Sequence, residues 1–129
     1  MGIGAFDQVT PHNEGVNIFD FLTTTDVLLY GSGSLNLYLT EILASNSDTI
    51  DHRIRLFFTP NIGGNCYIGD VLLPARCGYD LAPPILVLHA LGLDALPFAF
   101  SAQDFLRVST LVTMNTGTEI DLYCIGGVL

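Results

Sequence analysis

The chain has 129 residues, of which 50% are hydrophobic and 13% are charged, and its 13 acidic residues outnumber four arginines to give a formal charge of −9. A single domain suits this length, and the acidic charge excludes proteins that bind nucleic acid or anionic membranes through a basic surface. With so few charged residues, an isolated monomer would expose hydrophobic surface, and we therefore expect an oligomer or an assembled state. The alternative is a compact β-sandwich that needs few charges.

The N-terminal region is predicted to be an arm, residues 1–15, that precedes a β-sandwich domain at 16–129. Glycine and polar residues dominate this arm, as is common at chain ends. Its hydrophobic residues and those of the first predicted strand, 16–22, suit strand addition or docking in a groove of a partner. The candidate contacts from this region are Phe6, Ile18, Phe19 and Phe21. A second short strand is predicted at 27–30.

The most regular pattern lies in residues 35–59, where hydrophobic and polar residues alternate in two runs. A period of two is typical of strands. The first run places Leu35, Leu37 and Leu39 on one face, and the second places His52, Ile54, Leu56 and Phe58 on one face. Short polar residues at 45–49 favour a turn between them. We therefore predict a long β-hairpin at the centre of the fold.

Further strands are predicted at 66–73, 105–113 and 119–125, and the proline-rich stretch 75–103 holds a short strand at 85–88 or a helical turn at 86–91. Residues 115–117 are predicted to form a hairpin turn between the last two strands. The residues expected to face the core in these two strands are Leu106, Val108, Val112, Ile120, Leu122 and Cys124. About eight short strands without a convincing amphipathic helix indicate an all-β, antiparallel two-sheet sandwich of jelly-roll type.

The serine and histidine side chains that could take part in catalysis or metal binding do not combine into a recognisable active site. Ser32 lies in a glycine-rich turn without the strained elbow and partner histidine of a serine nucleophile. The histidines His12, His52 and His89 lack metal-ligand spacing. We predict no catalytic residue, cofactor or metal site, and hence no enzyme.

One polar loop offers several oxygens, from Asn46, Asp48 and Asp51. Calcium needs six to eight such ligands, and the spacing of a calcium-binding helix-loop-helix motif is missing. A solvated polar turn is therefore the expected structure, with a bound cation as the alternative.

The cysteines Cys66, Cys77 and Cys124 are expected to be buried, reduced hydrophobes, because they lack ligand spacing. Pairing of Cys66 with Cys77 is the alternative. Arg53 and Arg55 lie two apart on one strand face, where they can meet carboxylates of a neighbouring strand or of a partner, or simply face solvent. Both are candidate partner contacts.

Three segments in order, LTEILASNSDTIDHRIRLFF, GGNCYIGDVLLPA and AQDFLRVSTLVTMNTGTEIDLYCIGG, resemble a small β-sandwich module of tailed-bacteriophage virions. That module has a VTEIxxxN strand, a proline-alanine step and a GDxLxVxS strand. Here residues 39–46, Pro74 with Ala75, and residues 103–109 take these places. The resemblance covers residues 27–129. Gln103 departs from it by standing where glycine is usual, and the proline-rich stretch is longer than the module needs.

The resemblance implies a non-enzymatic virion protein, assembled in the host cytoplasm. A capsid decoration or cement subunit is expected, which binds the major capsid protein or other virion proteins and forms a homo-oligomer, with a trimer favoured. A neck or tail accessory protein is the alternative within this class. A carbohydrate-binding or receptor-binding module is the alternative outside it, for which Tyr67, Tyr79 and Tyr123 are candidate aromatic contacts although tryptophan is absent.

Overall fold

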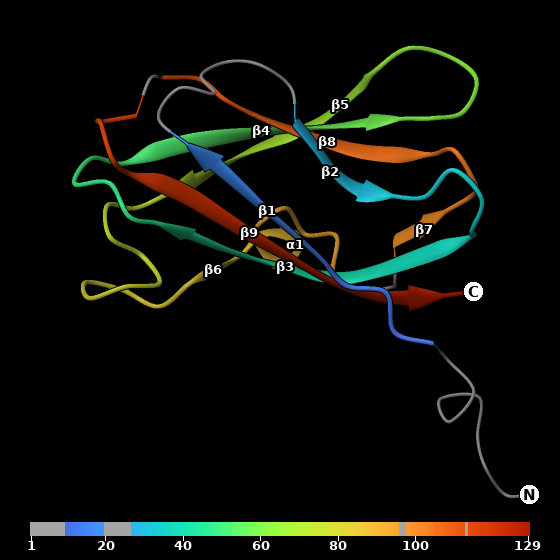
Figure 1. Ribbon diagram of the computed structural model, residues 1–129, viewed down its shortest axis with the longest axis horizontal. Coiled ribbons are helices and arrows are strands. Elements are labelled where there is room, and N and C mark those ends of the chain that lie inside the picture. Colours follow the sequence, from blue (N-terminus) through green and yellow to red (C-terminus); the bar gives the residue numbers. More distant parts are fainter. Residues whose placement is uncertain (1–9, 20–26, 96–97, 113) are drawn as a thin grey trace, which may run out of the picture.

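The computed structural model describes residues 10–19, 27–95, 98–112 and 114–129. Its described part contains nine strands and one short helix, and Figure 1 shows two layers of strands packed face to face. The elements in chain order are β1 (Glu14–Phe19), β2 (Val27–Gly31), β3 (Leu37–Asn46), β4 (His52–Thr59), β5 (Cys66–Leu73), β6 (Ile85–Leu86), α1 (Val87–Ala90), β7 (Phe98–Phe100), β8 (Phe105–Thr110) and β9 (Glu119–Val128).

The two layers are antiparallel sheets. Sheet A has the strand order β1-β9-β3-β6, with β7 also paired to β3, and sheet B has the order β2-β8-β4-β5. Without β7, eight strands form two four-stranded sheets in which the chain crosses repeatedly between layers, and only β4 and β5 are joined as a hairpin within one sheet. These connections are those of a jelly roll. The predicted all-β, two-sheet, jelly-roll-like sandwich is therefore confirmed.

Two predicted hairpins are wrong. Strands β3 and β4 were expected to pair, but β3 pairs with β9 in sheet A while β4 pairs with β5 and β8 in sheet B. The turn near residues 115–117 likewise joins β8 of sheet B to β9 of sheet A. An alternating pattern shows only that each strand has one buried face. Two strands meet this condition equally well when they are paired in one sheet and when they face each other across a core from two sheets. Both loops are therefore arches between the sheets.

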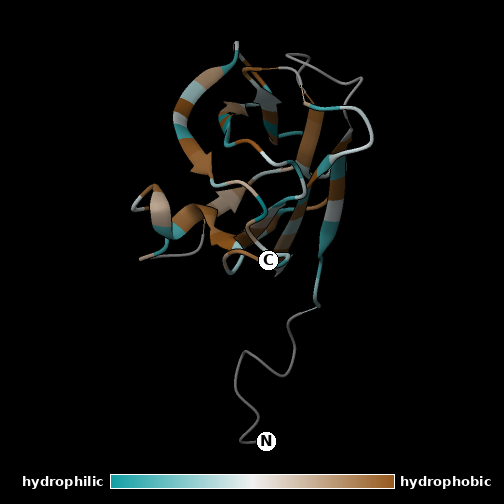
Figure 2. Ribbon diagram, turned by 90° about the vertical axis from the view of Figure 1, so that its left-hand side faces the viewer, coloured by the Kyte–Doolittle hydropathy of each residue, from teal (hydrophilic) through white to brown (hydrophobic). Residues whose placement is uncertain are grey.

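The core lies between the inner faces of the two sheets, where alternate residues of the strands are buried. Figure 2 shows hydrophobic and hydrophilic residues alternating along strands. In β4 the predicted inward residues His52, Ile54 and Leu56 are buried, and so are Ile120, Leu122 and Cys124 in β9. A register shift after Leu39 changes which positions of β3 face inward. Inward residues then continue as Ile42, Ala44 and Asn46.

Two residues expected on the inner faces lie outside them. Leu35 precedes β3 and is 40% exposed, and Val112 follows the end of β8 and is 58% exposed. Side chains alternate between the two faces of a sheet only within a strand. Leu35 and Val112 lie beyond the ends of their strands, which explains why they are exposed.

Residues 10–15, which the sequence assigns to the predicted arm, contact the edge of sheet A. Strand β1 begins at Glu14 and pairs with β9 at the edge of sheet A. Before it, Thr10 accepts a backbone hydrogen bond from Val128, and His12 donates one to Gly126. Residues 10–15 are therefore part of sheet A, and of the predicted arm only residues 1–9 lie outside the described residues.

The proline-rich stretch contains both structures that were considered for it. β6 pairs with β3, and the four-residue helix α1 follows directly. The Glu41 carboxylate accepts hydrogen bonds from the backbone N–H groups of Ile42 and Leu88, which ties α1 to β3. Within the described residues, no helix is long and apolar enough to cross a membrane.

Candidate functional site

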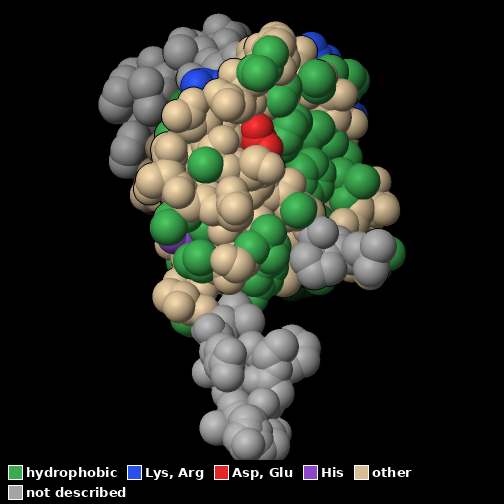
Figure 3. Space-filling view, turned by 90° about the vertical axis from the view of Figure 1, so that its right-hand side faces the viewer, with side chains coloured by type: hydrophobic (Ala, Val, Ile, Leu, Met, Phe, Trp, Pro, Cys, Tyr) green, Lys and Arg blue, Asp and Glu red, His purple; other side chains and the backbone are tan. Residues whose placement is uncertain are grey.

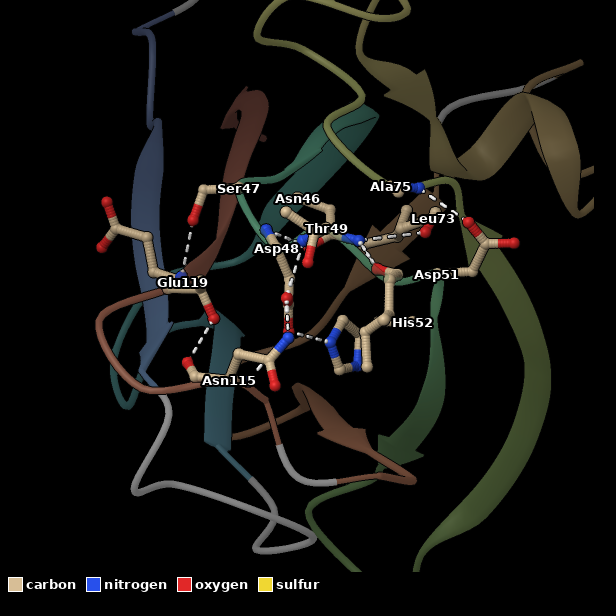
Figure 4. A network of polar contacts seen from close by, with 12 residues as sticks. Asn46, Ser47, Asp48, Thr49, Asp51, His52, Leu73, Ala75, Asn115 and Glu119 are labelled. Atoms are coloured by element: carbon tan, nitrogen blue, oxygen red, sulfur yellow. Dashed lines mark hydrogen bonds and ion pairs between the residues drawn. The ribbon is translucent and has the colours of Figure 1, made fainter.

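The first candidate region is a buried polar network in the arch between β3 and β4. Asp48 and His52 have side chains that are 0% exposed, and the His52 Nε2 atom lies 2.8 Å from the Asp48 Oδ2 atom. Asn115, from the arch between β8 and β9, donates to the same carboxylate from its backbone N–H at 2.9 Å and from its Nδ2 atom at 2.6 Å. Figure 4 shows the three side chains converging, so Asp48 links the two arches.

Residues around Asp48 extend this link. The Asn46 side chain donates to the backbone oxygens of Ile50 and Leu73 and accepts from the Asp48 N–H. Ser47 and Glu119 exchange two hydrogen bonds, since the Ser47 N–H donates to the Glu119 carbonyl and the Glu119 N–H donates to the Ser47 hydroxyl. These bonds join the end of β3, the end of β5 and the start of β9 (Figure 4).

The environment of Asp48 determines what it can do. Burial by itself would raise its pKa, but the N–H of Asn115, the His52 ring and the Asn115 amide outweigh burial and hold the pKa far below its usual range. With the Thr49 N–H donating as well, both carboxylate oxygens are occupied by nitrogen donors. The predicted solvated turn is therefore wrong for the buried Asn46 and Asp48, whose role is structural. Asp51 is exposed and accepts the Ala75 N–H.

The other histidines lie far from this network. His12 contacts Glu14 at 3.0 Å, and the exposed His89 contacts Asp94 at 2.7 Å, which raises the pKa of His89. Among the residues described, no group of three or more histidine, cysteine or acidic side chains has an arrangement that could hold a metal ion.

The second candidate region is the outer face of sheet B, which carries three of the four arginines. Arg53 and Arg55 alternate with the buried residues of β4, and Arg107 alternates with Leu106 and Val108 of β8. We name this surface the basic face. One row across its four strands consists of residues that are in register: Leu28, Arg107, Phe57 and Tyr67.

Arg55 has the carboxylate partner that the sequence offered as one alternative. Its Nε and Nη2 atoms donate to the two Asp70 oxygens on β5 at 2.9 and 3.0 Å. This pairing raises the pKa of Arg55 and lowers that of Asp70. The Arg55 guanidinium also lies 5.2 Å from the centre of the Tyr67 ring, a cation–π distance. Arg53 is exposed and is in register with Leu72.

The remaining predicted partner contacts have different positions. Ile18 lies in the core with 1% exposure, because β1 turns it inward, so its side chain is not on the surface. The backbone of Phe19 pairs with Glu119, and Phe6 and Phe21 lie outside the described residues. Sequence reasoning missed Arg107, although the alternation around it was sufficient to place it on an outer face.

The outer face of sheet A differs in charge. Its outward acids are Glu41, Glu119 and Asp121, and its strands contain no arginine. Glu14 is in register with the buried Cys124 and therefore lies on the inner side of β1. Glu119 and Asp121 alternate with the buried residues of β9, so they point outward, where Glu119 accepts from Asn17 and Asp121 accepts from the Tyr79 hydroxyl at 2.7 Å. We name this surface the acidic face. Tyr123 and Ile125 extend along the same strand and are partly exposed.

One end of the sandwich is viewed directly in Figure 3, where hydrophobic side chains cover much of the surface. Leu35, between β2 and β3, and Ile62, between β4 and β5, are exposed hydrophobic residues, and Ile62 is 88% exposed. Arginine side chains are visible only along the upper side of this view, which is the side of sheet B in Figure 1.

The cysteines are all free. Cys77 and Cys124 are buried as expected, whereas Cys66 begins the edge strand β5 and is exposed. The alternative pairing of Cys66 with Cys77 is therefore not formed.

Gln103, which stands where the resembled module has glycine, has a φ angle of 71°. Glycine adopts this left-handed conformation without strain, whereas residues with a side chain rarely do. A scan of protein-family models, a search of curated proteins and a search of solved structures find no match to this chain.

Proposed function

We propose that the chain is a non-enzymatic structural protein of a bacteriophage virion, which binds an assembled capsid surface as a decoration or cement subunit and forms a homo-oligomer, with a trimer as the expected state. The major capsid protein is the expected partner. The jelly roll supports this proposal only as a fold class, because capsid proteins, lectins and cupins all use it.

The observation that carries the proposal is the exposure of large hydrophobic side chains on both outer faces. Leu28, Tyr67 and Leu72 are partly exposed on the basic face, and Leu86, Tyr123 and Ile125 are partly exposed on the acidic face. Exposed apolar groups that recur across a sheet face mark interaction surfaces in soluble proteins. This pattern fits a structural protein whose two outer faces are buried by neighbouring subunits in an assembly.

Co-sedimentation with purified virions and with empty capsids tests the proposal. We expect the full chain to pellet with particles and saturate at a fixed ratio to the major capsid protein. A variant lacking residues 1–9 tests the predicted arm without removing residues 10–15, which pair with β9. Full-strength binding by this variant contradicts a role for the arm, and no binding by the full chain contradicts the proposed function.

A carbohydrate-binding module is the second candidate, favoured by one cluster on the acidic face. Tyr79 is 44% exposed and Tyr123 is 46% exposed, and both lie near Asp121, to which the Tyr79 hydroxyl donates. The bond to this carboxylate raises the pKa of Tyr79 to about 12. Sugar sites combine such aromatic rings with polar groups. A glycan array with the wild-type chain and a Tyr123→Ala variant tests it; the absence of hits excludes this candidate.

A further inference from the structure

The two outer faces of the sandwich are complementary in charge. The strands of sheet B hold three arginines and one acid, Asp70, on the outer face, whereas those of sheet A present three acids, Glu41, Glu119 and Asp121, and no arginine. In a chain with a formal charge of −9, a face with an excess of positive charge is a local exception. The two faces lie on opposite sides of one molecule (Figure 1).

Hydrophobic side chains accompany the charges on both faces. On the basic face, Arg107 lies between Leu28 and Phe57 in one cross-strand row, and Arg53 is opposite Leu72. On the acidic face, Tyr123 is in register with Leu43, which is in register with Leu86. Each face therefore offers apolar area for burial together with charges that direct its pairing.

We propose that the basic face of one copy of this chain docks against the acidic face of a second copy. This inference rests on the proposed function, since it identifies the contact by which the structural protein self-associates. The contact is heterologous, because two different surfaces meet, and the pair keeps one free acidic face and one free basic face. Sheets that stack face to face bury their outward side chains as a sandwich core does.

Charge selects this arrangement over a symmetric one. Two basic faces brought together would oppose Arg53 and Arg107 to like charges, and two acidic faces would oppose Glu119 and Asp121 to like charges. Like charges in contact disfavour an interface strongly. The mixed contact instead places arginines opposite carboxylates. Arg55 contributes less, because Asp70 already occupies its guanidinium.

The test uses two complementary variants of the full chain. The first, Arg53→Glu with Arg107→Glu, reverses the basic face and leaves the Arg55–Asp70 pair intact. The second, Glu119→Arg with Asp121→Asn, replaces the two negative charges of β9 on the acidic face by one positive charge and keeps an oxygen for the Tyr79 hydroxyl. Sedimentation velocity over a concentration series measures association, and circular dichroism confirms that each variant is folded.

A matched control separates the faces from net charge. Arg53→Gln with Arg107→Gln lowers the net charge by two, and so does Thr49→Glu with Thr116→Glu at exposed arch positions outside both faces. We expect the arginine variant to associate at least about tenfold more weakly than the wild type. The threonine variant should associate like the wild type. Equal weakening by both would overturn the inference.

Mixing the two charge-reversed variants is the decisive measurement. Each alone should be monomeric, whereas their equimolar mixture should associate, because the reversed face of one complements the reversed face of the other. A wild-type chain that stays monomeric up to about 1 mM, or a mixture that stays monomeric, overturns the inference. A monomeric wild type that still pellets with virions would leave the proposed capsid binding standing while it overturns self-association. A chain that associates but does not pellet with virions would support the contact between copies and contradict the proposed capsid binding.

Discussion

The buried Asp48–His52 network and the basic face each contain a carboxylate paired with a nitrogen-containing side chain at almost the same distance, but the two pairs differ in how much they should stabilise the fold. In the buried network the Asp48–His52 contact is 2.8 Å long and both side chains are 0% exposed. On the basic face the Arg55–Asp70 contact is 2.9 Å long, and its side chains are 38% and 17% exposed. Losing one partner of a buried pair leaves an uncompensated buried group, whereas water replaces a lost partner at the surface. We therefore expect the first region to affect stability more strongly than the second, for which binding to a second copy is proposed.

Replacing Asp48 should have the largest effect. In Asp48→Ala, the buried His52 ring and the partly buried N–H of Asn115 lose their shared acceptor, so we expect a loss of about 3–5 kcal/mol in the free energy of unfolding. Urea denaturation at pH 7 measures it. Asp51→Ala, in the same arch but exposed, is the control and should cost about 1 kcal/mol or less. Similar losses in the two variants would contradict the division between the regions.

Acid should weaken the buried network. The pKa of Asp48 is lower in the folded chain than the value of about 3.9 in an unfolded chain. The ionised carboxylate therefore stabilises the fold fully above about pH 4, and this contribution is lost as the pH falls further. We expect the stability gap between wild type and Asp48→Asn to narrow below about pH 4. Denaturation curves at a series of pH values measure the gap, and a constant gap would refute this assignment.

Removing the second anchor of Asp48 should have a smaller effect. Asn115→Ala deletes the Nδ2 donor but retains the backbone N–H that also reaches the carboxylate. A single hydrogen bond to a charged group contributes about 1–3 kcal/mol, so thermal and urea unfolding should show a loss in this range. Thr116→Ala, at the exposed neighbouring position, should have no comparable effect. If Asn115→Ala is also silent, the two arches are held together by other contacts.

The smallest stability change is expected on the basic face. Arg55→Gln removes the partly exposed pair with Asp70, and the unfolding midpoint should shift by less than about 3 °C, because water still reaches the freed carboxylate. The same variant should weaken self-association measurably, since it lowers the positive charge of this face. If Arg55→Gln lowers the stability but leaves self-association unchanged, the basic face contributes to the stability of the fold and not to binding, contrary to our expectation.

The sequence predicted the strands well because alternation is a local property. The alternation of His52, Ile54 and Leu56, and that of Ile120, Leu122 and Cys124, identified residues that are buried. It also placed Arg53 and Arg55 on an outer face, and the number and spacing of the strands indicated the correct fold class. Local patterns did not reveal the register shift after Leu39, which changes the inward positions in β3.

Tertiary structure alone decided which strands are neighbours. A polar loop such as residues 45–51 has the same composition whether it closes a hairpin or spans two sheets, because both leave one face of each strand buried. The network of Asp48 depends on Asn115, which is 67 positions away in the chain, and no periodicity reports a contact at that separation. Likewise, Arg107 joins Arg53 and Arg55 only because β8 pairs with β4. Sequence thus determined which side of each strand is buried, while the packing of the sheets determined which polar residues meet.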